Sequence, residues 1–301
     1  MANDKTGVVL MTYGSATTAD QVATYMQHVY PNGVPDGVIE DFEERYRLVG
    51  RSPLIDITQK QAELTEKALG ADYIVRAGMQ HSHPFIDEVV AECKAAGATR
   101  LIGVILAPQY SPIIMRRYID ALEGSAKAHG IDEVKIAAPW GTEEHFIALM
   151  AKRVNEALER LREKHGTVPP IVFTTHSLPK RVVEMDLSYL DQLRETAEAI
   201  AAKIDPSLKW EMAYQSAGHT PEEWLKPDLV DVLARVRDEG GKAVLIVPLQ
   251  FLADHLEILY DLDIAGGEQC QEYGIEYNRI ELPNTDPQFI EALAAAVQTI
   301  E

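Results

Sequence analysis

A histidine and a glutamate lie in two short polar strings, THSLP (residues 175–179) and ADHLE (residues 253–257). Each string follows an apolar run rich in β-branched residues, IVFTT before the first and AVLIVPLQF before the second. Such runs are typical of buried strands, and the carboxyl ends of parallel strands form the edge where open α/β folds bind ligands. His176 and Glu257 therefore predict a metal or proton-transfer site at that edge.

Both strings also have a purely structural interpretation. Ser177 as a helix N-cap with Pro in the first turn would explain SLP, and Asp254 as N-cap with Glu257 at N3 would explain ADHLE. Against this, Asp254, Glu257 and Asp261 follow the i, i+3, i+7 spacing of one helix face. Carboxylates at this spacing repel one another, and a cation or a proton relay would offset the repulsion. A solvated acidic face remains the alternative.

The elements that must position these residues alternate along the chain. Predicted strands cover residues 8–12, 73–77, 101–107, 134–137, 171–175, 210–214, 243–248 and 275–280, with amphipathic helical stretches between them. This order predicts an α/β fold with parallel sheets covered by helices. VKIAAPWGTEEHFIALM also resembles NRIELPNTDPQFIEALA, with Ile136 corresponding to Ile280, which predicts two similar four-stranded halves. We expect an N-terminal domain over 1–140, a C-terminal domain over 141–285 that carries His176 and Glu257, and a last helix (286–301) that packs back on the first domain.

Composition excludes several classes of partner. The 301 residues carry a formal charge of −19 and a pI of about 4.9, so the surface should repel nucleic acid and anionic membranes. Stable membrane insertion is not expected, because no run of 18 apolar residues occurs, and MANDKTG does not resemble a signal peptide, so the predicted location is cytoplasmic. Cys93 is expected to pack in a helix and Cys270 to lie in an exposed loop; two cysteines alone cannot supply four thiolates to a cluster.

Further polar residues follow the other predicted strands. They are Tyr13, Gln80, His81, His83, Gln109 and Tyr110 in the first half, and Gln215 in the second. Two such edges that face one another would form a cleft between the domains, a favoured position for a ligand. Simpler roles are also open: Tyr13 as an aromatic lid, His83 as a partner of the next helix turn, and Ser52 with Pro53 as a helix start.

Several strings together resemble the ferrochelatases, which insert ferrous iron into a porphyrin. They are MTYG, ERYRLVGRSPL, HSHPFI, LAPQYS, TTHSLP, YQSAGHTPEEWLKPD and ADHLEILYDLD, and they span nearly the whole chain. THSLP followed some eighty residues later by ADHLE is the most specific pair. Within the family, the sequence is most similar to the coproporphyrin ferrochelatases of Gram-positive bacteria.

The resemblance implies two Rossmann-like domains with the porphyrin in the cleft between them. It assigns His176 and Glu257 to metal handling and pyrrole deprotonation, with Asp261 extending the acidic track. It places Tyr13 on the opposite face of the macrocycle, where a tyrosine can ligate the product iron. Arg45, Ser52, Tyr118, Gln80 and His81 match substrate-binding positions.

The expected partners follow from the same resemblance. The substrates are Fe²⁺ and a porphyrin, and no iron–sulfur cluster is expected. The product could pass transiently to a downstream haem-synthesis enzyme. The sequence departs from the family pattern at HVYPNGVPDG (residues 28–37), where relatives often carry arginines, and in its GRSPL loop, which is one residue short.

The chemistry suits these residues. Two N–H protons must leave a free-base porphyrin as Fe²⁺ enters, and imidazole can both ligate Fe²⁺ and accept a proton near pH 7. The alternatives are a protoporphyrin IX ferrochelatase, a sirohydrochlorin cobaltochelatase and, more remotely, a non-catalytic porphyrin or haem carrier. A carrier would have no need of the acidic helix face.

Overall fold

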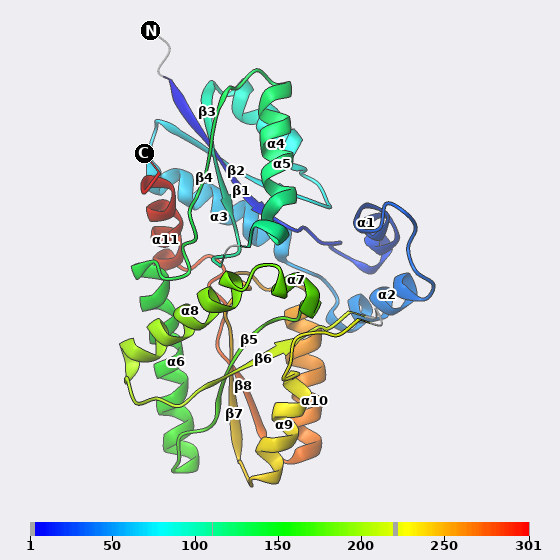
Figure 1. Cartoon of the computed structure of the whole chain (residues 1–301), viewed down its shortest axis with the longest axis vertical. Helices are drawn as coiled ribbons and strands as arrows, with labels where there is room; N and C mark the ends of the chain where they lie inside the picture. The colour runs from blue at the N-terminus through cyan, green and yellow to red at the C-terminus, as the bar shows by residue number, and fades with distance from the viewer. Residues whose placement is uncertain (1–3, 110, 219–221, 301) are drawn as a thin grey trace. The chain divides into compact units, whose positions relative to one another are not determined.

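The computed structural model describes residues 4–109, 111–218 and 222–300. The chain divides into two compact units, and each is built around its own sheet (Figure 1). Unit 1 comprises Met1–Glu143, Ala253–Leu256 and Asn284–Glu301, and unit 2 comprises Glu144–Leu252 and Glu257–Pro283. Within the described residues, no helix combines the length and the apolar character that crossing a membrane requires.

Unit 1 holds a four-stranded parallel sheet in the order β2-β1-β3-β4. Its strands are β1 (Lys5–Thr12), β2 (Tyr73–Met79), β3 (Ala98–Ile105) and β4 (Glu133–Ile136). Its helices are η1 (Ala19–Gln21), α1 (Val22–Val29), α2 (Val38–Val49), α3 (Leu54–Leu69), α4 (Ile86–Ala95), α5 (Pro112–Ala128) and α11 (Pro287–Gln298). α4 and α5 cover one face of the sheet, and α3 and α11 cover the other (Figure 1).

Unit 2 repeats this arrangement with a parallel sheet in the order β6-β5-β7-β8. Its strands are β5 (Ile171–His176), β6 (Glu211–Gln215), β7 (Ala243–Pro248) and β8 (Glu276–Arg279). Its helices are α6 (Glu144–His165), α7 (Lys180–Glu184), α8 (Ser188–Ile204), α9 (Leu229–Asp238), η2 (Ile258–Gly266) and α10 (Gly267–Tyr273). α6 and α8 pack together on one face, and α9 and α10 on the other (Figure 1).

The central strands explain why each sheet forms. Along β1, residues 6–11 are all buried, and all six residues of β7 are buried. Strands that are apolar on both faces need helices on both faces, and each unit supplies them from amphipathic segments. The predicted fold class, two similar four-stranded parallel sheets flanked by helices, is confirmed, and all eight predicted strands are present.

The two units share detailed turn geometry as well as strand order. The amide of Met79 donates to Pro84 O (2.8 Å), and the amide of Tyr214 donates to Pro227 O (2.9 Å). Each proline follows a cis peptide bond and precedes a ten-residue helix, α4 or α9. The repeat inferred from the sequence is therefore present in the backbone.

The residue correspondence predicted for that repeat is wrong by one position. Ile136 pairs with Gly103 in the first sheet, and Arg279 pairs with Ile246 in the second. Leu106 and Leu249, three residues after Gly103 and Ile246 and directly after β3 and β7, each donate the backbone amide to the neighbouring strand. Ile136 therefore corresponds to Arg279, and not to Ile280.

Two local predictions also need correction, and a third is confirmed. The helix after THSLP begins at Lys180, so Ser177 is not its N-cap; instead Ser177 Oγ donates to Leu225 O (3.3 Å). Cys270 is fully buried in the core of unit 2, not in an exposed loop, because α10 extends through it. Cys93 is buried in the core of unit 1, as predicted.

Candidate functional site

His176 is the last residue of β5, and Glu257 lies directly before η2. Both belong to unit 2, and His176 Nε2 lies 3.8 Å from Glu257 Oε2. That separation is too long for a direct hydrogen bond, yet short enough for both atoms to act on one proton or one metal ion. Their side chains are 30% and 31% exposed, so solvent and substrate can reach them. The two residues predicted from separate strings therefore meet.

The backbone fixes which nitrogen of His176 carries the proton. His176 Nδ1 lies 2.5 Å from Ser177 O, and a carbonyl oxygen can only accept, so Nδ1–H is the donor. In the neutral ring, Nε2 then holds the lone pair, and this is the nitrogen nearest Glu257. The arrangement presents a base or a metal ligand on the side of Glu257.

A buried network holds the strand end on which His176 sits. Thr175 Oγ1 donates to Gln250 Oε1 (3.0 Å), and Gln250 Nε2 donates to Tyr189 Oη (2.7 Å). Burial raises the pKa of Tyr189 to about 12, so its phenol stays neutral. The network ties β5 to the loop after β7 and so restricts the position of His176. Sequence reasoning missed Tyr189 and Gln250. The only signal for Tyr189 in the sequence is a hydroxyl group on an otherwise apolar helix face.

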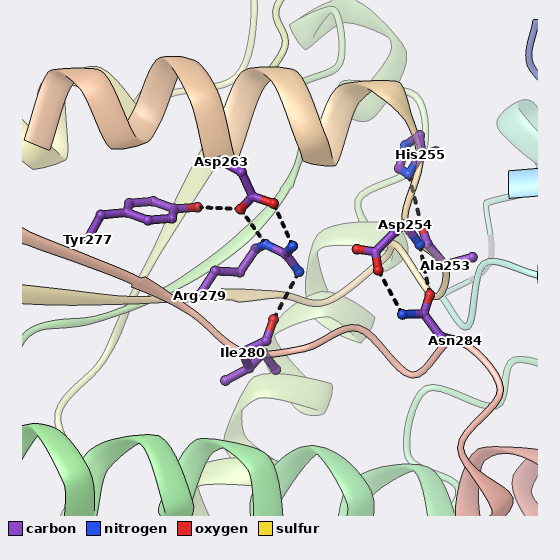
Figure 2. Close-up of polar contacts among 8 residues, drawn as sticks. All are labelled: Ala253, Asp254, His255, Asp263, Tyr277, Arg279, Ile280 and Asn284. Carbon is purple, nitrogen blue, oxygen red and sulfur yellow. Dashed lines mark hydrogen bonds and ion pairs between the residues drawn. The ribbon is translucent and has the colours of Figure 1, made fainter. Parts of the chain in front are cut away.

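The predicted row of three carboxylates on one helix face is wrong. Asp254 lies in the loop before the helix, where Asn284 Nδ2 donates to its carboxylate (2.7 Å) (Figure 2). Asp261 lies in η2, which is a π-helix, so i, i+3, i+7 spacing no longer places residues on one face. Ser216 Oγ donates to the Asp261 carboxylate. The same geometry removes the capping-box interpretation, because helix formation begins two residues after Asp254.

In unit 1, Tyr13 occupies the position that His176 occupies in unit 2. Met11 O accepts from the Leu106 amide and Thr174 O from the Leu249 amide, so the residues two further along, Tyr13 and His176, correspond. The Tyr13 side chain is 44% exposed, and its ring centroid lies 4.5 Å from that of His81. Tyr13 is therefore accessible at the carboxyl edge of the first sheet.

His81 is held neutral beside Tyr13. Its side chain is buried, with 7% exposed, and Nδ1–H donates to His28 O (3.0 Å). Burial lowers the pKa of His81, the His28 carbonyl opposes this, and the charge of Arg117 lowers it further. Burial, with Tyr13 as a smaller cause, raises the pKa of Tyr118 far above its usual range. Tyr13, His81 and Tyr118 thus form a cluster in which burial disfavours a charge on His81 and on Tyr118.

The remaining predicted substrate-binding residues are placed differently from one another. Gln80 follows β2 directly, and its backbone N–H donates to Thr12 O (2.9 Å). It therefore lies at the same carboxyl edge of the first sheet as Tyr13. Ser52 is buried, and its hydroxyl is 3.1 Å from that of Ser15. Arg45 lies on α2, forms an ion pair with Asp41 (2.8 Å) and packs over the Phe42 ring. Tyr110 and residues 219–221 of the quoted strings lie outside the described residues.

Several buried polar atoms at these edges have no hydrogen-bond partner among the described residues. They include His81 Nε2 and Gln80 Oε1 in unit 1, and both amide atoms of Gln215 in unit 2. Gln215 is only 3% exposed and pairs in register with His176. Buried polar groups are normally satisfied, so these atoms are available for a further hydrogen bond. No group of three or more His, Cys, Asp or Glu side chains in the described part of the chain is arranged to hold a metal ion.

Comparison with known proteins decides the family. The model of the family described as Ferrochelatase matches residues 5–300. The chain belongs to the ferrochelatase family. It is 33% identical to a coproporphyrin III ferrochelatase of Geobacillus thermodenitrificans over 305 residues, which cover 99% of this chain and 96% of the relative. It is 36% identical to a ferrochelatase of Herpetosiphon aurantiacus over 300 residues, covering 97% and 98%.

Among solved structures, SirB from Bacillus subtilis with Fe³⁺ matches with a TM-score of 0.59 and 13% identity, covering 98% of this chain and 94% of the other. That likeness concerns the fold alone. Membership of the ferrochelatase family makes the chain a lyase, a porphyrin metal chelatase of haem biosynthesis with ferrous iron as substrate.

Proposed function

We propose that the chain inserts Fe²⁺ into coproporphyrin III to give coproheme III, with His176 and Glu257 handling the metal and the pyrrole protons. The observation that carries the residue roles is the approach of His176 Nε2 to Glu257 Oε2 (3.8 Å) on accessible side chains. The similarity to a coproporphyrin III ferrochelatase over nearly the full length supports the choice of porphyrin.

Proton transfer follows from the tautomer of His176. The reaction exchanges two pyrrole protons for one Fe²⁺, so two protons must leave the ring. Nε2 accepts one, since Nδ1–H is already committed to Ser177 O. The Glu257 carboxylate stabilises the resulting imidazolium or accepts the second proton. Asp261, held by Ser216, is the next carboxylate along the helix and extends the route for protons.

Tyr13 has a separate role in this proposal. It corresponds in position to His176 but belongs to the other sheet, and its exposed phenol ligates the product iron. Gln80, His81, Ser52, Tyr118 and Arg45 contact the porphyrin or shape its pocket. The buried, unpartnered atoms of Gln80 and His81 support contact for these two, whereas the Ser15–Ser52 pair supports a role for Ser52 in shaping the wall.

The remaining parts of the proposal concern cofactors, location and product transfer. Both cysteines are buried, and burial raises the thiol pKa of Cys93 to about 12 and of Cys270 to about 11. Thiols in this state are poor metal ligands, which supports a chain without an iron–sulfur cluster. We place the reaction in the cytoplasm, with transient handover of the product to a downstream haem-synthesis enzyme.

The test is an anaerobic insertion assay with coproporphyrin III and protoporphyrin IX side by side, followed through the porphyrin absorption bands. We expect a higher kcat/KM for coproporphyrin III. A higher value for protoporphyrin IX would favour the second candidate, a protoporphyrin IX ferrochelatase. The similarity to a protein named ferrochelatase, without a stated porphyrin, from Herpetosiphon aurantiacus is the reason to test it. A spectrum that changes on porphyrin binding, without faster metallation, would identify a carrier instead.

A further inference from the structure

The helix that follows Glu257 differs from α5, the helix at the corresponding place in unit 1. In unit 1, α5 lies between Leu106, whose amide donates to Met11 O, and Gly130, which has a positive φ. In unit 2, η2 and α10 lie between the corresponding residues Leu249 and Gly274, and this segment is one residue longer. An extra residue inside a helix is accommodated by i→i+5 hydrogen bonds, and Ile258–Gly266 is a π-helix. The wide turn therefore reflects an insertion that must be held in place.

An ion pair from β8 holds the middle of this π segment. Arg279 Nε and Nη2 each lie 2.7 Å from a different oxygen of Asp263, which makes the pair bidentate. Tyr277 Oη donates to the same carboxylate (3.4 Å), and Arg279 Nη1 donates to Ile280 O (3.0 Å). Figure 2 shows the guanidinium with its fork directed at Asp263 and its remaining nitrogen directed at the chain after β8. Arg279 thus joins the π segment to the sheet.

Stability alone does not account for this pair. The Arg279 side chain is 12% exposed and that of Asp263 32%, so both charges are partly removed from water. An apolar pair of similar volume often stabilises a fold equally well or better. Unit 1 uses an apolar residue: Ile136, at the position of Arg279, packs against the first core. A bidentate ion pair fixes the relative position of its two side chains, whereas an aliphatic contact does not.

We propose that Arg279 is a positioning residue that holds the register of the π segment through Asp263, and so sets the directions of Glu257 and Asp261. Glu257 directly precedes η2 and Asp261 lies two residues before Asp263, so a change in helix register would rotate both carboxylates. Ser216, which follows β6 directly, donates to Asp261, and Arg279, the last residue of β8, binds Asp263. The inference rests on the proposed function for its kinetic consequence, although the register itself is independent of it.

The test uses Arg279→Met in the full chain, with Arg153→Met as the matched control. Arg153 Nη1 donates to Glu281 O (2.8 Å) and to Leu282 O, so this arginine contacts the segment just after Arg279 through backbone carbonyls. We expect Arg279→Met to lower kcat by about tenfold while the KM for porphyrin stays unchanged, because a lost charge-assisted hydrogen bond has consequences on that scale. Amide hydrogen exchange over residues 258–266 should rise by about tenfold as well. The control should change neither quantity.

A double variant keeps the proposal testable if the single change destabilises the protein. Arg279→Met with Asp263→Leu leaves no unpaired charge, and should retain stability while kcat stays low. Unchanged kcat and unchanged exchange over 258–266 in the double variant would overturn the proposal. If the wild-type chain fails to insert iron at all, the proposed function fails, and the exchange measurement still decides the role of Arg279.

Discussion

The two units use one backbone plan for different purposes. Strand order, the turn at Pro84 and Pro227, and the helices α4 and α9 correspond closely. The side chains at corresponding positions differ: Tyr13 against His176, and Ile136 against Arg279. The shared strand pairing builds a carboxyl edge in each unit, and different side chains lie on that edge. Unit 1 presents an aromatic cluster around Tyr13 and His81, and unit 2 presents an imidazole beside a carboxylate.

The largest expected effect comes from changing His176, the proposed base in unit 2. His176→Ala should lower the rate of iron insertion by about 10³-fold or more, because it removes both a metal ligand and a general base. Porphyrin binding should persist, since the proposed substrate-binding residues Gln80, His81 and Arg45 are unchanged. Insertion rates and porphyrin binding by fluorescence quenching measure the two quantities separately. Substantial turnover in this variant would show that His176 is not the base.

Glu257→Gln should have the next largest effect. The amide keeps the shape of the side chain but can neither accept a proton nor stabilise an imidazolium, so kcat should fall by about 10²-fold. Asp254→Asn is the matched control, because its carboxylate is already bound by Asn284 Nδ2. Unchanged kcat in Glu257→Gln would leave the carboxylate with a purely structural role.

Core packing offers a comparison of the two units that is independent of activity. Gly103 and Ile246 occupy corresponding strand positions. A Cβ at Gly103 would lie 2.5 Å from Leu122 Cδ2 and 2.9 Å from Met11 Cε, so Gly103→Ala should lower the free energy of unfolding by about 2 kcal/mol through overpacking. Ile246→Ala should cost about 3 kcal/mol by leaving a cavity. Urea denaturation measures both, and a Gly103→Ala chain as stable as wild type would contradict the packing argument.

His81 should give a smaller, pH-dependent effect that is specific to unit 1. Burial lowers its pKa in the folded chain, so below about pH 6.5 the unfolded chain binds more protons. The free energy of unfolding should therefore fall as the pH drops below that value. His81→Gln, which can still donate to His28 O, should lack this component. Urea midpoints between pH 5 and pH 8 would reveal it, and identical pH profiles for the two proteins would refute it.

The sequence predicted the sheets and the approach of His176 to Glu257 for a physical reason. Buried parallel strands are long apolar runs, and the polar residues after them must emerge at one edge, which located His176, Glu257, Tyr13 and Gln80. The π-helix was missed because one inserted residue leaves an apolar helical pattern nearly unchanged. The partnership of Asp263 with Arg279 joins segments that only the tertiary fold brings together.

Tyr13→Phe should produce the smallest change in rate and the clearest change in product. If the phenol ligates iron only after insertion, its loss affects a state that follows the chemical step. The change in kcat should therefore be much smaller than the loss of about 10²-fold expected for a missing general acid or base. The visible spectrum of bound product should shift, because removal of a phenolate ligand alters the iron coordination. The ring remains to pack against His81, so the cluster in unit 1 should persist. An unchanged product spectrum would show that Tyr13 does not ligate the iron, whereas a loss of rate as large as that of His176→Ala would show that the two units divide the chemistry differently.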